Sequence, residues 1–504
     1  MATHGTPEKS IAAVHMEEEQ KLPPGTKGGV LGATHEVVTF DPALSRRIAR
    51  KFDYRILSVF LLINLFSFID RVNIGNARLL GLSTDLGLGV GLRYNIALMC
   101  LFVSYCVVEL PANIVCKKIG GHIWIPFLVV SFGLVTMLTS VVQSHNGLYA
   151  VRFILGCLEG GISPGLVFML AQFYRRSELG FRTSIYISAA SASGAFGGLL
   201  AIGFSQIPRW GVIHTWRNIF FFEGLISILL GIAAFFLIPA GPTEAKFLSP
   251  EEKVVAVDRL RLDSAGTTEH AKTSLKHVLQ ALCSPHTLGC GLGFFFGNTT
   301  AQSFSVFSPS IIKAMGYTNT KAQLLSVGPY VAACIISIIV GWLSDRFKKR
   351  AVLIICSVPL GIAGFFMLEF LPASRPWAKY GALYLAASGL YAFLPLWLAW
   401  AMNNSATPTV RASASGIVFT MGSLGGIIAP WTYLPGDAPQ YRTGHAVMLS
   451  FLCASWACAV ALYFYSKWEN KQRDMGKRDY RLAGLTKEQE LELSSNHPAF
   501  RYFL

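Results

Sequence analysis

The chain has 504 residues, of which 52 % are hydrophobic and only 14 % are Asp, Glu, Lys or Arg, and its formal net charge is +15. Soluble domains carry about 25 % charged residues, so this composition excludes an ordinary cytosolic enzyme and a disordered chain. It favours a protein with many membrane spans. The 10 cysteines lie mostly in apolar stretches without metal-ligand spacing, and we expect no metal site.

The chain begins with a polar segment, 1–53, that lacks the apolar stretch of a secretory signal. We therefore predict an N-terminal tail. Twelve apolar runs follow, each near the length of about 20 residues that crosses a bilayer. Lipid cannot satisfy free backbone polar groups, so these runs must be helices. They are 54–77, 94–115, 122–142, 147–172, 183–207, 217–238, 287–312, 322–343, 351–371, 379–402, 411–433 and 446–466.

A polar segment between the sixth and seventh runs divides them into six and six. Placing both termini in the cytoplasm puts most of the 43 Lys and Arg residues on the cytoplasmic side, which is the usual bias of membrane proteins. This placement explains the net charge without nucleic acid. The predicted parts are an N-terminal tail (1–53), a first half (54–238), a cytoplasmic linker (239–284), a second half (285–466) and a C-terminal tail (467–504).

Six plus six helices with a long middle loop resemble a major-facilitator transporter, an all-α membrane fold of two pseudo-symmetric halves with its site at mid-depth. The loop after the eighth run supports this resemblance. It carries Gly341, Asp345 and Arg346 in the layout G-x-x-x-D-R. Gly341 allows close helix approach, and Asp345 can pair with an arginine and lock one state of the carrier. We predict a gating role for all three; the plain alternative is a basic anchor loop.

Ionisable residues inside the spans are the strongest candidates for a functional site, because such residues are costly in lipid. Arg152 and Glu159 are seven residues apart and share one helix face. Helical rise places Asp70 and Arg71 of the first span near the depth of Arg152. Two cations and two carboxyl groups can therefore occupy one layer. We predict anion binding by Arg71 and Arg152 and proton binding by Asp70 and Glu159; a structural ion pair or a helix-end location is the alternative.

Other polar residues on the spans could contact the rest of a substrate, although each could equally form an interhelical hydrogen bond. They are Tyr105, Tyr186, Asn298, Gln302, Tyr330, Asn403 and Asn404. Glu109 could be structural or functional, and Glu223 and Glu369 are weaker candidates. A G-x-S-x-G sequence at 161–165 lacks the preceding strand of a hydrolase elbow, which argues against a membrane-embedded enzyme.

Several motifs make the chain resemble the fungal anion:cation symporter family of major facilitators, which includes allantoate, nicotinate and other vitamin permeases. The matching stretches are Asp70-Arg71-x-Asn73-Ile-Gly-Asn76-Ala77, Arg152-x-x-x-Gly156-x-x-Glu159-Gly160, Glu223-Gly224 and the ending Phe500-Arg501-Tyr502-x-Leu504. The resemblance implies proton-driven import of a small organic anion, with protons in place of any cofactor. It implies a plasma-membrane protein, and we expect a monomer. Export of an anionic metabolite is the alternative, because coupling is reversible.

Overall fold

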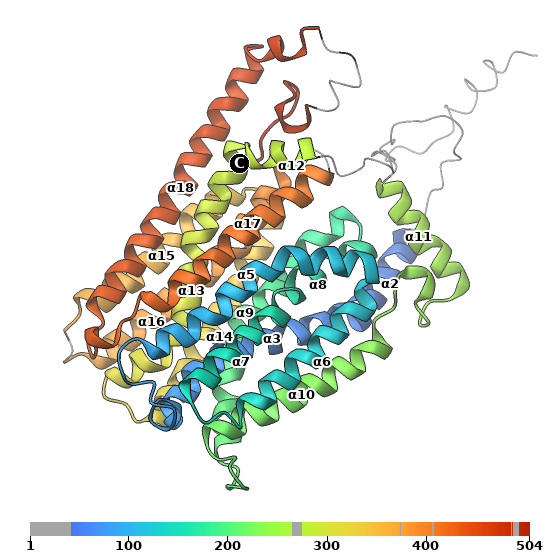
Figure 1. The fold of residues 1–504 in the computed structure, drawn as a ribbon. Helices are drawn as coiled ribbons and strands as arrows, with labels where there is room; N and C mark the ends of the chain where they lie inside the picture. The colour runs from blue at the N-terminus through green and yellow to red at the C-terminus, as the bar shows by residue number, and fades with distance from the viewer. Residues whose placement is uncertain (1–41, 265–274, 373, 406–407, 485, 487–492) are drawn as a thin grey trace, which may run out of the picture. The chain divides into compact units, whose positions relative to one another are not determined.

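The computed structural model describes residues 42–504 except 265–274, 373, 406–407, 485 and 487–492. Pro42–Leu504 forms one compact unit, and its regular elements are helices (Figure 1). The long ones are α3 (Ser58–Ala77), α5 (Arg93–Ile119), α6 (Gly121–Thr139), α7 (His145–Glu159), α8 (Ile162–Phe173), α9 (Arg176–Ser205), α10 (Trp216–Leu237), α13 (Pro285–Ala314), α14 (Asn319–Phe347), α15 (Arg350–Phe370), α16 (Pro376–Asn403), α17 (Pro408–Ile428) and α18 (Arg442–Asp474).

Among the described residues, 10 helical stretches are long and apolar enough to cross a membrane, and 11 if α5 counts as one bent span. The bend in α5 is 51° and separates Arg93–Glu109 from Pro111–Ile119. Pro111 explains it, because proline removes a backbone hydrogen bond and its ring clashes with the preceding turn. The predicted all-helical membrane fold is confirmed.

The expected run 287–312 corresponds to α13, which is 30 residues long but lies outside that apolar set. Its composition explains the difference. Thr299, Thr300 and Ser303 are fully buried within the bundle, so α13 carries hydroxyl groups where a lipid-facing helix carries leucine. The seventh predicted span is therefore a helix that packs against protein on several sides, including α3, α16, α17 and α18.

Helices before the linker pack against helices after it in several places: α9 contacts α14 and α16, α3 contacts α13, and α5 contacts α17. Polar contacts cross this boundary where α3 ends and α14 begins. Gln323 donates a hydrogen bond to the Asn76 carbonyl at 3.1 Å, and Asn319 donates to the Leu79 carbonyl at 2.7 Å. Gly75 lets α3 and α13 touch, because any side chain there would collide with the Val306 carbonyl.

Part of the predicted N-terminal tail is folded. Residues 1–41 lie outside the described residues, but Pro42–Phe52 forms helix α2. The ring of Phe52 packs edge-on against Phe173, Tyr174 and Phe247, which accounts for its complete burial. The predicted linker contains helices α11 (Pro250–Ser264) and α12 (Leu275–Leu282). Lys51 of α2 pairs with Glu252 of α11 at 2.6 Å, so tail and linker are fastened together.

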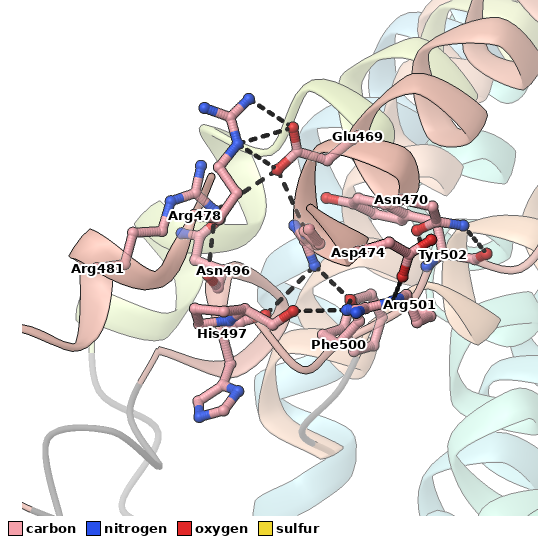
Figure 2. A network of polar contacts seen from close by, with 12 residues as sticks. Glu469, Asn470, Asp474, Arg478, Arg481, Asn496, His497, Phe500, Arg501 and Tyr502 are labelled. Atoms are coloured by element: carbon pink, nitrogen blue, oxygen red, sulfur yellow. Dashed lines mark hydrogen bonds and ion pairs between the residues drawn. The ribbon is translucent and has the colours of Figure 1, made fainter. Parts of the chain in front are cut away.

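The predicted C-terminal tail is also folded. Helix α18 continues to Asp474, and the last residues turn back onto the ends of α16 and α18. Figure 2 shows Glu469 surrounded by arginines: Arg473 at 3.1 Å, Arg478 at 2.7 Å and Arg481 at 3.7 Å. We call these four residues the terminal cluster. Arg473 also donates to the Phe500 carbonyl at 2.8 Å, and therefore ties the end of the chain to α18.

Candidate functional site

Two ion pairs lie in the middle of the helices that precede the linker. Arg71 on α3 donates through Nε to Glu159 on α7 at 2.8 Å. Arg152 on α7 donates through Nη1 to Asp70 at 3.1 Å, and Asp70 is the residue before Arg71 on α3. Three of these side chains are at most 3 % exposed and that of Arg71 is 8 % exposed. The layer of two cations and two carboxyl groups predicted from the sequence is therefore present.

Local sequence explains how α7 reaches α3. Gly156, one turn before Glu159, lies against α5 so closely that any side chain would collide with the Leu101 carbonyl and Ser104. The α7 helix ends at Glu159, and a turn at Gly160 and Gly161 separates it from α8. Small residues thus let the chain bring a charged side chain into a crowded interior.

A third carboxyl group belongs to the same region. Glu223 on α10 is fully buried and accepts a hydrogen bond from the amide of Asn73, one turn after Asp70 on α3. Thr136 on α6 donates to Asp70 at 3.4 Å. We call Asp70, Arg71, Arg152, Glu159 and Glu223 the core cluster. It joins α3, α7 and α10 through side chains that are all inside the bundle.

Several polar atoms of the core cluster have no hydrogen-bond partner among the described residues. They are Nη2 of Arg71, Nε and Nη2 of Arg152, Oε1 of Glu159 and Oε1 of Glu223. Buried polar atoms in proteins are nearly always paired, and each unpaired one costs about 1–3 kcal/mol. Arg71 and Arg152 thus keep N–H groups that could donate to an acceptor from outside the protein.

A cavity of about 100 Å³ lies beside this cluster. Arg71, Tyr105 and Tyr186 line it from the helices before the linker, and Asn298 and Gln302 line it from α13. Aromatic rings cover much of the remaining wall: Phe68, Phe294, Tyr391 and Phe419. The guanidinium carbon of Arg71 lies 4.7 Å from the ring centre of Tyr105 and 5.1 Å from that of Phe68. The cavity is thus apolar and aromatic, with one cation in its wall.

The structure separates the predicted substrate residues into two groups. Arg71, Tyr105, Tyr186, Asn298 and Gln302 line the cavity. The others lie outside the lining of this cavity, and their role in substrate binding stays a prediction.

Arg152 lies behind the wall, paired with Asp70. Tyr330 is buried, and its hydroxyl is 2.9 Å from that of Ser308. Asn403 lies at the end of α16, where its side-chain oxygen is placed to accept from Arg350 at 3.2 Å. Sequence marked these residues as polar and intramembrane, but it could not show which face of each helix points inward.

The predicted gating loop forms a local ion pair. Asp345 accepts from Arg350 at 3.3 Å across the turn between α14 and α15. Arg346 instead places its guanidinium 5.3 Å from the ring centre of Trp342. Gly341 is buried on α14. The arginine that pairs with Asp345 is therefore the one that begins α15, and the gating roles of the three residues stay a prediction.

Sequence reasoning missed some residues of the site. Phe68 and Tyr391 line the cavity, and Asn73 holds Glu223. A helical spacing signal was available for Asn73, because it follows Asp70 by three residues and so shares its face. No comparable signal marks Phe68 or Tyr391, since aromatic residues are common throughout the spans.

A multi-helix membrane bundle with a buried ionic cluster beside a central cavity defines a carrier of small solutes. The chain matches the Major Facilitator Superfamily over residues 60–430, and it belongs to that family. It is similar to the MFS-type transporter cnsO of Penicillium expansum, with 32 % identity over 479 residues and 92 % of each chain covered. It is also similar to the MFS-type transporter efuF of Hormonema carpetanum, with 32 % identity over 438 residues, covering 86 % of this chain and 88 % of the relative.

Solved structures show the same fold. A D-xylose-proton symporter has a TM-score of 0.63 and 14 % identity, covering 82 % of this chain and 97 % of its own. An inward-facing, unoccupied bacterial homologue of the human lysosomal transporter Spinster has a TM-score of 0.60 and 17 % identity, covering 85 % and 97 %. The protein is therefore a multi-pass secondary transporter of the major facilitator superfamily and not an enzyme.

Proposed function

We propose that this transporter is a proton-coupled symporter of a small organic anion, such as a carboxylate vitamin or a ureide, and that it belongs to the anion:cation symporter group. One observation carries the proposal. Arg71 lines the cavity, is almost fully buried, and keeps Nη2 without a hydrogen-bond partner. A guanidinium group recognises a carboxylate through two parallel hydrogen bonds, and such charge-assisted bonds are about twice as strong as neutral ones.

The rest of the cavity supports a flat anion. Phe68, Tyr105 and Tyr391 contribute aromatic rings to its lining, while Asn298 and Gln302 contribute amide groups from α13. Asn298 already donates to the Gly422 carbonyl at 2.8 Å, so its side-chain oxygen remains as an acceptor for a substrate N–H or O–H. An aromatic or amide-bearing carboxylate would satisfy both kinds of group. Long aliphatic acids would leave the amide groups unpaired.

Proton coupling follows from competition for Arg71. Glu159 holds Nε of Arg71 at 2.8 Å, so an incoming carboxylate must share the guanidinium with an anion already bound there. When Glu159 takes up a proton it becomes neutral and its hold on Arg71 weakens. Binding of the anion and binding of the proton therefore favour each other. Asp70 and Arg152 form a second ion pair, and a proton on Asp70 would weaken it in the same way.

Alternating access is the proposed movement. The hydrogen bonds from Gln323 to Asn76 and from Asn319 to Leu79 close one end of the bundle and would break when that end opens. We place both termini in the cytoplasm and the protein in the plasma membrane as a monomer, with the proton as the only coupling ion.

Purified protein in liposomes tests the proposal. We expect an inward proton gradient to drive accumulation of at least one of nicotinate, pantothenate and allantoate, and a protonophore to abolish the accumulation. Nicotinamide, the uncharged counterpart of nicotinate, serves as the matched control and should not accumulate. Glu159→Gln should remove the dependence on the gradient while exchange of bound anion persists. Accumulation of nicotinamide, or uptake of the acids unaffected by the gradient, would contradict the proposal.

A further inference from the structure

The carboxyl group of Glu223 differs from the other two carboxyl groups of the core cluster. Asp70 and Glu159 each accept a hydrogen bond from a guanidinium group. Glu223 accepts only from the amide of Asn73, and no cationic group of a described residue lies within ion-pair distance of it. Its side chain is fully buried and Oε1 has no partner. A positive group therefore stabilises the negative charge of Asp70 and Glu159, but none in the described part of the chain stabilises a negative charge on Glu223 in the same way.

The net charge of the core cluster also indicates that one of its carboxyl groups is neutral. The core cluster contains three carboxyl and two guanidinium groups, so complete ionisation would leave one uncompensated negative charge inside the bundle. An isolated buried carboxylate costs many kcal/mol, and a protein avoids this cost by keeping the group protonated. The groups whose fields act on Glu223 are Asp70 on α3 and Arg152 and Glu159 on α7, two acids against one base.

We propose that Glu223 is a neutral carboxylic acid that holds a resident proton, and that this proton sets the charge balance on which coupling operates. The amide of Asn73 donates to Oε2, so the proton sits on the unpartnered Oε1. With this proton the core cluster is electrically neutral. The role in coupling rests on the proposed function, whereas the protonation of Glu223 does not.

The consequence is a definite proton count. A neutral cluster that receives a monoanion gains one negative charge, and one further proton on Glu159 or Asp70 restores neutrality. We therefore infer one cycling proton for each negative charge of the substrate, added to a proton on Glu223 that stays in place. The rigid setting of Glu223 fits a fixed proton, because the adjacent Gly224 leaves no room for a side chain between α10 and the Met137 amide of α6.

Infrared spectroscopy of the purified full chain, without substrate, tests the resident proton. A protonated carboxyl group gives a carbonyl-stretch band that an ionised one lacks and that shifts in heavy water. We expect this band at neutral pH, its loss in Glu223→Gln, and its retention in Glu159→Gln and Asp70→Asn. Asn73→Ala is the matched control, because loss of its hydrogen bond should shift the band to higher frequency without removing it.

Two results would overturn the inference. One is a spectrum that Glu223→Gln leaves unchanged at neutral pH, and the other is loss of the band in Asp70→Asn with Glu223 intact. Thermal unfolding of Glu223→Gln shows whether the variant is folded, so a lost band is not mistaken for a lost structure. Failure of the liposome assay with all three acids would reject the proposed function but leave the infrared result standing, so the two failures are distinguishable.

Discussion

The core cluster and the terminal cluster are both networks of arginines and carboxyl groups, but they differ in how many of their polar atoms are paired. They also differ in burial, because Arg478 and Arg481 of the terminal cluster are 22 % and 24 % exposed. In the terminal cluster Glu469 receives three arginines, and Arg473 also donates to backbone carbonyls (Figure 2). None of its described side-chain atoms is buried without a partner. In the core cluster each guanidinium group meets one carboxyl group and retains unpaired nitrogens.

This difference in pairing points to different roles for the two clusters. A fully paired buried network can only hold its parts together, because any further ligand would have to displace an existing partner. In a partly paired network the unpaired buried atoms lower the stability of the folded protein. A ligand that forms hydrogen bonds with them removes this loss. The terminal cluster fastens the end of the chain to α16 and α18, whereas the core cluster is where we propose that an anion and a proton bind.

Glu469→Ala should destabilise the protein most. It leaves Arg473, whose side chain is 1 % exposed, without its carboxylate, and breaking such a pair costs about 3–5 kcal/mol. Thermal unfolding in detergent measures the loss. Asp474→Ala is the matched control: its pair with Arg501 is 2.8 Å long but largely exposed, and we expect less than about 1 kcal/mol. Equal shifts in the two variants would contradict a structural role for the terminal cluster.

Arg71→Ala should change binding more than stability. Loss of a charge-assisted hydrogen bond costs about 1.5–3 kcal/mol, which corresponds to a Kd for the transported acid about 10- to 100-fold higher. Calorimetry with the acid selected by the liposome assay measures this change. The stability loss should be smaller than for Glu469→Ala, because Glu159 can take up a proton when its partner is removed. Arg473→Ala should leave the Kd unchanged. An equal rise of the Kd in both variants would contradict the difference in role between the core cluster and the terminal cluster.

The pair between α2 and α11 should give the smallest effect, and one that depends on pH. The hydrogen bond from Lys51 lowers the pKa of Glu252 below its usual range. The ionised form is thus favoured in the folded protein, and its contribution is complete above the ordinary glutamate pKa and lost as the pH falls through the lowered one. The free energy of unfolding of the wild type should exceed that of Glu252→Gln by less than about 1 kcal/mol at neutral pH. This difference should vanish once the pH falls below the lowered pKa of Glu252.

The neighbouring Glu251→Gln provides the comparison for this last experiment, because Glu251 is exposed on the same helix. Unfolding curves recorded across the acidic range for the three proteins are sufficient. A difference between wild type and Glu252→Gln that grows as the pH falls would show that the pair contributes in some other way than by the charge on Glu252.

The sequence by itself determined the helical membrane architecture and the identity of the core residues. Span length, apolar composition and the cost of charge in lipid depend only on local residue types, so Asp70, Arg71, Arg152 and Glu159 could be selected without coordinates. Helical periodicity even placed them at one depth. These inferences needed no knowledge of which helix lies beside which.

Tertiary structure decided the pairing and the cavity wall. Arg71 meets Glu159, and Arg152 meets Asp70, only because of where the bundle places α3 and α7. Only the rotation of each helix brings Gln302 to the cavity and Asn403 to Arg350. The folded ends of the chain were missed for a related reason. Segments 42–52 and 493–504 lie outside the predicted apolar runs, and their order comes from contacts with distant residues such as Phe173 and Asn404. Long-range contacts of this kind leave no periodic trace in a single sequence, because they depend on geometry that the whole bundle sets.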